Sequence, residues 1–276
     1  MKLMGVVISV LFAMVLAWEL RAGQVTQTQG SQPAITSEPV IVELFTSEGC
    51  SSCPPADALL AELDARPRLG SGEVIAIEEH VTYWDELGWK DPFSSSSWTT
   101  RQYDYASALH NGNPYTPEMV VDGTAGFVGS RGSTARQEIE KAAATRKARV
   151  EISEASPPQN NSVAFKISVE KLSGVAPKDT GEVILAITES GLHSSVKAGE
   201  NVGKELRHSP VLRELKVIGV VGKNGQEGFA AQPVVKLDSK WDVGNLRAIV
   251  FVQERKSRRI LAVGTVHLAQ RDLASR

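Results

Sequence analysis

The chain has 276 residues, of which 30 are Lys or Arg and 32 are Asp or Glu, so its formal net charge is only -2. This balance, with no long basic run, argues against a nucleic-acid binder whose affinity depends on neutralising phosphates. The length is ample for two domains with apolar cores, so folding requires neither a disulfide nor a metal.

The N-terminus has the features of a secretory signal peptide. Lys2 precedes an uncharged apolar run, Met4 to Trp18, and the small residues Ala22 and Gly23 follow shortly after it. Because this run is short for a membrane span, we expect a cleaved signal over residues 1–23 and an exported protein, periplasmic or extracellular, with no stable membrane span after cleavage. The alternative left open is an uncleaved membrane anchor.

A linker and a strand–helix–strand unit follow the signal. Residues 24–38 are rich in Thr, Gln, Ser and Pro, which predicts a flexible linker. The β-branched run 40–45 predicts a strand buried on both faces, and apolar residues at helical spacing after Pro54 predict a helix. A second strand is predicted at 73–78, and a crossover of this kind makes the two strands parallel.

The rest of the chain divides at residue 147. Before it we predict a helix at 97–111, a hairpin with an Asp-Gly turn at 118–128 and a closing helix at 134–147. After it come seven short strand-like segments separated by turn residues, with no convincing helix. This pattern is typical of an antiparallel β-sandwich.

The chain contains two cysteines, Cys50 and Cys53, at the junction of the first strand and the first helix. They are placed to reach only each other, and export would make the disulfide their default state. Unpaired N–H groups at a helix N-terminus favour a thiolate, so Cys50 is the predicted attacking thiol. Cys53 is the predicted resolving thiol, which attacks the mixed disulfide between Cys50 and a client.

This order of elements, with the CxxC at the first strand-to-helix junction, resembles a thioredoxin fold. Tyr115-Thr116-Pro117 stands just before the third strand, where thioredoxin-like proteins carry a cis-proline that packs against the active-site cysteines and presents backbone to a bound substrate peptide. The resemblance implies an α/β thioredoxin-like domain over residues 39–147, followed by an all-β sandwich-like domain over residues 148–276.

The chain further resembles an exported thioredoxin-like family in the sequences of three segments, 42–57, 80–93 and 199–204, and in Tyr115-Thr116-Pro117. That family is known only as a domain of unknown function, number twelve twenty-three. One position departs from the pattern: Thr82 stands where that family usually has Asp. A role of that acid is therefore not carried over to this chain. The resemblance supplies a fold and no reaction.

Three further positions are candidates for supporting the cysteines. Glu43 lies in the first apolar strand, where a desolvated carboxylate could exchange a proton with Cys53. The alternative is that Glu43 lies at a sheet margin with its carboxylate in water or paired to Lys or Arg. His80 is a candidate proton shuttle or an ordinary structural histidine. The aromatic loop with Trp84 and Trp89 either forms part of a substrate groove with Tyr115, Thr116 and Pro117 or is a structural lid.

We therefore predict an exported thiol-disulfide oxidoreductase that exchanges disulfides with a protein client, is reset by a redox partner and needs no cofactor. The alternative is a non-catalytic partner-binding or metal-binding protein on the same scaffold. Cys50, Cys53 and His80 would provide three ligands, enough for copper or an open zinc site but too few for a closed structural zinc site. No metal is assigned. The motif leaves the direction of electron flow open.

Overall fold

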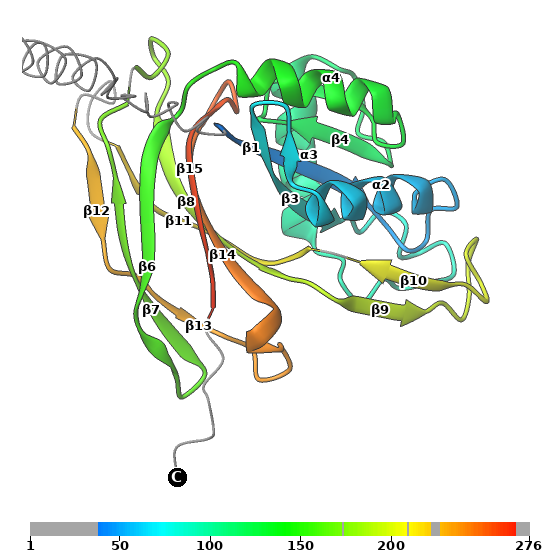
Figure 1. Cartoon of the computed structure of the whole chain (residues 1–276). Coiled ribbons are helices and arrows are strands. Elements are labelled where there is room, and N and C mark those ends of the chain that lie inside the picture. The colour runs from blue at the N-terminus through cyan, green and yellow to red at the C-terminus, as the bar shows by residue number, and fades with distance from the viewer. Residues whose placement is uncertain (1–37, 173, 209, 222–226, 269–276) are drawn as a thin grey trace, which may run out of the picture. The chain divides into compact units, whose positions relative to one another are not determined.

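The structure is a computed structural model that describes residues 38–172, 174–208, 210–221 and 227–268 (Figure 1). The predicted signal peptide, residues 1–23, lies outside the described residues, and so does the predicted linker 24–38 apart from Glu38. Within the described ranges, no helix is both long and apolar enough to cross a membrane.

The first half of the chain alternates strands and helices in the predicted order. Its elements are β1 (Glu38–Thr46), α2 (Pro54–Ala65), β2 (Arg68–Leu69), β3 (Gly72–His80), α3 (Ser96–Leu109), β4 (Glu118–Val121), β5 (Ala125–Val128) and α4 (Gly132–Ala143). Each strand and helix predicted here is present, with bounds shifted by a few residues, and β2 is additional.

The second half is built of strands, as predicted, with one short 3-10 helix, η3 (Val243–Asn245). The strands are β6 (Ala148–Gln159), β7 (Ser162–Val169), β8 (Gly181–Glu189), β9 (Leu192–Ser195), β10 (Glu205–His208), β11 (Val211–Val220), β12 (Phe229–Ala231), β13 (Val234–Lys236), β14 (Leu246–Glu254) and β15 (Ile260–His267). The sequence did not predict β9, β10 or β12.

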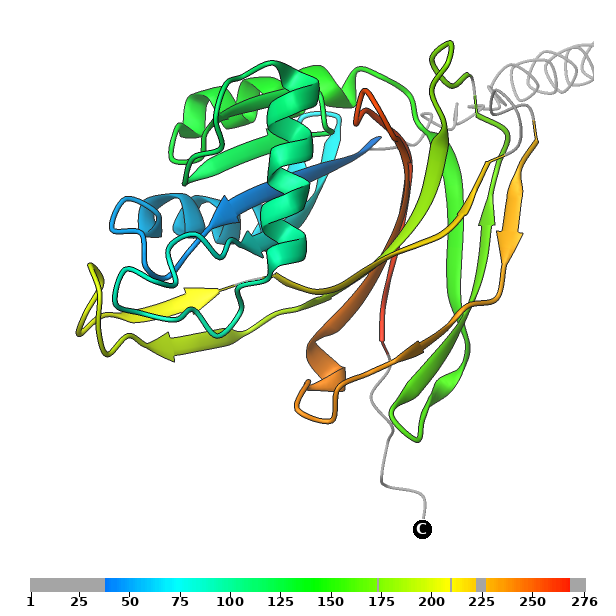
Figure 2. The same cartoon turned by 180° about the vertical axis from the view of Figure 1, so that it is seen from behind.

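Strands of both halves form one mixed sheet of 13 strands, in the order β12-β7-β6-β15-β14-β8-β11-β3-β1-β4-β5, with β13 beside β7 and β2 beside β3 (Figures 1 and 2). The halves join where β11 runs parallel to β3, with Val211 opposite Glu78. The predicted fold class, an α/β thioredoxin-like domain followed by an all-β sandwich-like domain, is therefore wrong. The chain is mostly β, and its halves share a sheet; the boundary at 147/148 stays a prediction.

The apolar cores explain why the sandwich prediction failed. Strands β8 and β14 are buried along almost their whole length, so neither face is left for solvent. One face packs against β6 and β7. The other contributes to a core shared with β1, β3 and α3, formed by Ile41, Ile75, Ile77, Trp98, Ile184, Ala186, Ile249 and Phe251, among others. A free-standing sandwich would expose that second face.

The helices cover both faces of the sheet around β1. Helices α2 and α4 pack on the face formed by Val40, Val42 and Leu44. Helix α3 packs on the opposite face (Figure 2). There Tyr105 contacts Phe45 edge to face, with the ring centroids 5.9 Å apart. Because successive strand residues point to opposite faces, this arrangement assigns every β1 side chain to one helix layer or the other.

The turn at Gly123 gives a test of the contact between the halves. Gly123 has φ +66°, and a Cβ there would lie 1.9 Å from the carbonyl oxygen of Arg258, in the turn between β14 and β15. We expect Gly123→Ala to lower the free energy of unfolding by about 1–3 kcal/mol more than a glycine substitution with backbone strain alone. Chemical denaturation measures this.

Gly70→Ala is the matched control, because Gly70 has φ +57° and a Cβ there would meet nothing closer than Glu140 Cγ at 3.7 Å. This substitution adds only the left-handed strain, about 1–2 kcal/mol. Equal losses for the two variants would contradict the close approach of the second half to the Gly123 turn.

Candidate functional site

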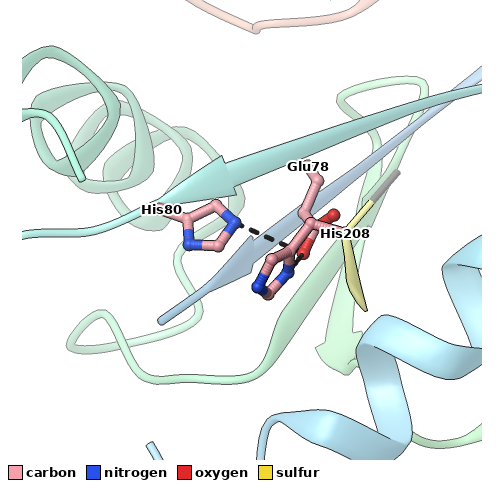
Figure 3. A group of neighbouring side chains, drawn as sticks. All are labelled: Glu78, His80 and His208. Atoms are coloured by element: carbon pink, nitrogen blue, oxygen red, sulfur yellow. Dashed lines mark hydrogen bonds and ion pairs between the residues drawn. The ribbon is translucent and has the colours of Figure 1, made fainter. Parts of the chain in front are cut away.

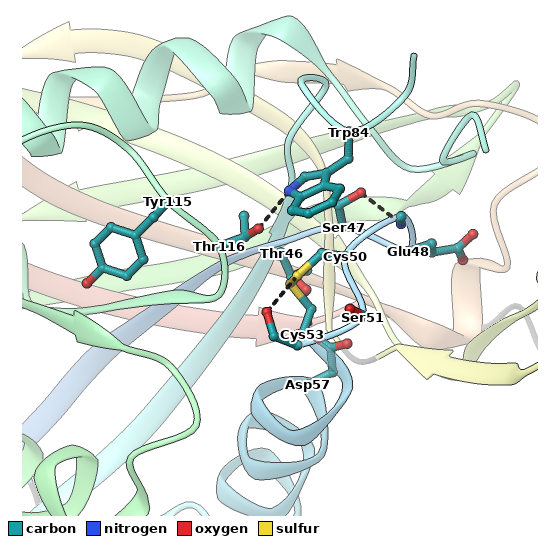
Figure 4. Close-up of a disulfide and its surroundings, with 12 residues drawn as sticks. Thr46, Ser47, Glu48, Cys50, Ser51, Cys53, Asp57, Trp84, Tyr115 and Thr116 are labelled. Carbon is teal, nitrogen blue, oxygen red and sulfur yellow. Dashed lines mark hydrogen bonds between the residues drawn. A yellow bond between two sulfur atoms is a disulfide. The ribbon is translucent and has the colours of Figure 1, made fainter. Parts of the chain in front are cut away.

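Cys50 and Cys53 form a disulfide between the end of β1 and the start of α2, with their Cα atoms 5.4 Å apart (Figure 4). Cys53 is the N-cap residue of α2, and Cys50 lies in the preceding turn. Prolines at 54 and 55 open the helix, where missing N–H groups cost nothing. Both cysteines are fully buried, whereas Ser51 and Ser52 between them are exposed.

Trp84 from the predicted aromatic loop lies against the turn that carries Cys50 (Figure 4). Its Nε1 donates to Thr116 Oγ1 at 2.7 Å. A Cβ on Gly49, next to Cys50, would lie 3.0 Å from Trp84 Cβ, a tight contact that the loop would have to relieve by a small shift. The structure thus brings Trp84 and Thr116 together at the cysteines.

The remaining predicted substrate-binding residues are Pro117, Trp89 and Tyr115. The Thr116–Pro117 peptide bond is cis, as the resemblance implies. Trp89 donates from Nε1 to Glu48 Oε2 at 2.7 Å, so it braces the turn before Cys50 instead of covering the sulfurs. The ring of Tyr115 points away from the disulfide in Figure 4, and partial burial raises its pKa to about 12.

Strands β9 and β10 and the loop between them, residues 192–208, form an arm of the second half that holds the turn carrying the cysteines. The loop between β9 and β10 places the buried side chain of Asn201 against this turn, where Nδ2 donates to Glu48 O at 2.8 Å and to Cys50 O at 2.9 Å. Glu200 Oε2 accepts from Ser51 N at 3.1 Å. The sequence signal for this arm was the family-like segment 199–204, whose position beside the cysteines it did not predict.

Glu43 does not lie beside Cys53. It points to the α3 face of β1, where Arg101 Nε donates to Glu43 Oε2 at 2.6 Å and Tyr105 Oη donates to Oε1. Although burial opposes its charge, the Arg101 guanidinium holds the pKa of Glu43 below its usual value. Because Val42 and Leu44 face α2, strand alternation excludes Glu43 from the cysteine side.

A carboxyl that the sequence analysis missed, Asp57, does lie on the cysteine side. Asp57 follows Cys53 by one turn of α2, and its backbone N–H donates to Cys53 O at 3.1 Å (Figure 4). Thr46 Oγ1 donates to Asp57 Oδ1 at 2.6 Å. Burial, together with the nearby charge of Glu78, raises the pKa of Asp57 to about 7. The sequence signal that could have identified Asp57 was an acidic residue on the apolar face of the predicted helix.

His80 belongs to a buried polar cluster that includes Glu78 and His208 (Figure 3). His80 Nδ1 lies 2.7 Å from Asp91 Oδ2, and His80 Nε2 lies 3.3 Å from Glu78 Oε1. His208 joins the cluster from β10, with Nδ1 2.8 Å from Glu78 Oε1 and Nε2 3.1 Å from Glu48 Oε1. Among the described residues, no hydrogen bond links His80 to either cysteine.

The carboxylates of this cluster favour protonated imidazoles. Burial opposes the charge on His80, but Asp91 holds the pKa of His80 well above its usual value. Burial likewise opposes the charge on His208, and Glu78 raises the pKa of His208 to about 9. Burial would raise the pKa of Glu78, yet His208 lowers it to about 2.

Asn201→Ala tests whether the two hydrogen bonds from Asn201 hold the turn that carries the cysteines. Glu48 O loses this donor, and Cys50 O loses one of two because it keeps the bond from Cys53 N, so we expect the free energy of unfolding to fall by about 1–3 kcal/mol and a small dithiol to reduce the disulfide faster. Denaturation and the kinetics of disulfide reduction measure both effects. Asn245→Ala, which removes only an exposed bond to Asp242, is the control. Unchanged reduction kinetics in Asn201→Ala would argue against this role of Asn201.

Comparison with known proteins places the chain in a family. Among solved structures, protein AGR_C_4864 from Agrobacterium tumefaciens is similar, with a TM-score of 0.64 and 23% identity over 86% of this chain and 97% of that chain. HBP35 of Porphyromonas gingivalis is similar with a TM-score of 0.60 and 14% identity, over 87% of this chain and 79% of that chain. At these identities the likeness shows the fold alone.

No curated protein matches the chain with significance. A family model described as "Protein of unknown function (DUF1223)" matches residues 41–253, which is most of the sequence. This chain therefore belongs to the DUF1223 family of proteins of unknown function.

Proposed function

We propose that this protein is an exported thiol-disulfide oxidoreductase that exchanges the Cys50–Cys53 disulfide with a protein client. The observation that carries the proposal is the disulfide itself, placed where a strand ends and a helix begins, with Thr116 close by. This local arrangement also supports a relation to the thioredoxin superfamily.

The exchange proceeds through a mixed disulfide between Cys50 and the client. When a client thiolate attacks Cys50 Sγ, the bond between Cys50 and Cys53 breaks and Cys53 leaves as a thiolate. A second client thiolate then attacks the client sulfur of the mixed disulfide and releases Cys50. The client is oxidised by two electrons, the protein holds the dithiol, and a redox partner reoxidises it. In the opposite direction the same bonds form and break in reverse.

Asp57 takes the place that the sequence analysis gave to Glu43. It is a buried carboxyl on the same face of α2 as Cys53, one turn along the helix. A carboxyl with a pKa of about 7 can both donate a proton to the departing Cys53 thiolate and take it back near neutral pH. Glu43, held by Arg101 on the other face, has no such path.

Access to the sulfurs requires the aromatic loop to move. Both cysteines are fully buried, and Trp84, beside their turn, is held by a hydrogen bond from its indole to Thr116. A client that replaces this hydrogen bond with backbone contacts at Thr116 would open the site and position its own sulfur. The exposed apolar side chains of Leu87 and Val202, 61% accessible each, lie in the two loops beside the site and offer it a docking surface.

Export is proposed from the N-terminal sequence. The apolar run from Met4 to Trp18 after Lys2 matches a signal peptide over residues 1–23. In an oxidising compartment a paired CxxC persists without a further cofactor. The proposed partners are thus a protein client and a protein that resets the disulfide.

One observation favours a second candidate, a partner-binding module without turnover. The two sulfurs have no exposed surface, as expected of a purely structural disulfide. In that case Cys50 would react no faster than an unactivated thiol. The trapping experiment below separates the two functions.

Cys53→Ala should trap a client as a mixed disulfide with Cys50, because the resolving thiol is absent and the intermediate persists. Non-reducing electrophoresis and mass spectrometry of exported fractions measure the product. Cys50→Ser is the matched control and should trap nothing above background. Equal trapping by the two variants, or none by Cys53→Ala, contradicts the assignment.

Asp57→Asn should slow the release of a peptide from the Cys50 mixed disulfide by about tenfold or more, because Cys53 loses its proton acceptor. Quenched-flow kinetics with a peptide disulfide measure this step. Asp64→Asn, a change on the same helix at a partly exposed residue paired with Arg247, is the control and should leave the rate unchanged. If both variants behave alike, Asp57 has no part in the proton transfer.

A further inference from the structure

We propose that Glu78, His80 and His208 bind a divalent transition-metal ion of the zinc class. The three side chains are at most 2% exposed and converge from β3 and β10 (Figure 3). The site uses neither cysteine, so it is distinct from the disulfide exchange proposed above and from a metal site built on the CxxC.

The spacing of the ligand atoms fits a small tetrahedral ion. His80 Nε2 and His208 Nδ1 lie 3.3 Å and 2.8 Å from Glu78 Oε1, and the three ligand atoms all lie within 4.8 Å of one another. Ligands at about 2.0–2.1 Å from tetrahedral zinc are about 3.3 Å apart. Small side-chain rotations therefore suffice to seat the ion.

Each histidine is oriented by a carboxylate on its other nitrogen. Asp91 binds His80 at Nδ1, at 2.7 Å, and Glu48 binds His208 at Nε2, at 3.1 Å. Metal-binding histidines characteristically donate the second ring N–H to a carboxylate, which fixes the ring and raises its basicity. Here both histidines have such a partner, and in both cases it leaves the nitrogen that faces Glu78 as the ligand.

The hydrogen bonding of His80 also points to a missing ligand. His80 Nε2 is buried and makes no hydrogen bond of standard geometry among the described residues; its contact with Glu78 Oε1, at 3.3 Å, is a long ion pair (Figure 3). A buried ring nitrogen without a hydrogen-bond partner is unfavourable. A metal ion at this point would satisfy it.

The charge and access of the site also suit a cation. A metal ion would displace a ring proton from each histidine, and the buried carboxylates of Glu48, Glu78 and Asp91 would then offset the charge of the divalent ion. His208 also lines a cavity of about 590 Å³ between α2 and the β9–β10 arm. This cavity reaches the site at His208, and the three protein ligands leave a fourth position for water.

The test measures Zn²⁺ binding to the full chain with its disulfide intact, by competition with a chromophoric chelator, and Co²⁺ binding by its visible d–d spectrum. We expect one equivalent to bind with a dissociation constant below about 1 µM. The Co²⁺ spectrum should show no thiolate charge-transfer band. Zn²⁺ should also raise the unfolding temperature of the wild-type chain.

Two variants remove one ligand nitrogen each while keeping the carboxylate bond. His80→Asn keeps a donor at the position of Nδ1 for Asp91, and His208→Gln keeps a donor at the position of Nε2 for Glu48. Each should weaken Zn²⁺ binding by about a hundredfold or more and abolish the thermal shift. Both should show the circular dichroism of the folded wild-type chain. His193→Gln, which changes a histidine lining the same cavity, should bind Zn²⁺ as the wild type does.

The proposal is overturned if the oxidised wild-type chain binds no Zn²⁺ in the micromolar range, or if both variants bind as tightly as the wild type. It is also overturned if binding appears only after reduction and is lost in Cys50→Ser, because the thiols would then be the ligands. None of these outcomes bears on trapping of a client by Cys50, so the two proposals fail separately.

Discussion

The arrangement around the disulfide depends on the place where β3 and β11 meet. Glu78 N donates to Pro210 O at 2.8 Å, and Val211 pairs with the same residue in parallel. This contact makes the sheet continuous between the two halves of the chain. It also fixes His208, at the end of β10, against Glu78, and with it the arm whose Asn201 holds the turn of Cys50. The strand that completes the sheet therefore also positions one wall of the candidate site.

Buried polar contacts, in addition to apolar ones, link the two halves. Arg101 of α3 binds Glu43 and also donates from Nη1 to Gln253 Oε1 of β14 at 3.0 Å. Such buried charged groups add little net stability because their desolvation opposes the attraction, but removing one partner is strongly destabilising. They therefore make the relative position of the halves specific. The turn of the cysteines is held in the same way, by the amide of Asn201, so its geometry depends on the second half being in place.

The local elements could be predicted from the sequence, but their assembly could not. The run 40–45 and the proline-opened helix after Cys53 carry strong local signals, and β1 and α2 lie where those signals put them. The pairing of β3 with β11 joins residues far apart in the chain, so the local sequence of neither strand indicates its partner. One signal was available: Val183 to Ile187 is as continuously apolar as the first strand, which is typical of a strand covered on both faces. Strand alternation would also have placed Glu43 away from α2, and the helix period would have placed Asp57 near Cys53.

The central claim is that Cys50 is an activated thiol in a protein built to exchange disulfides. The most direct measurement is the second-order rate constant of the reduced protein with a peptide disulfide, compared with that of a model peptide thiol at the same pH. The account predicts a reaction at least about a hundredfold faster than the model thiol and lost in Cys50→Ser. A rate no faster than that of the model thiol would contradict it and leave the disulfide a structural one.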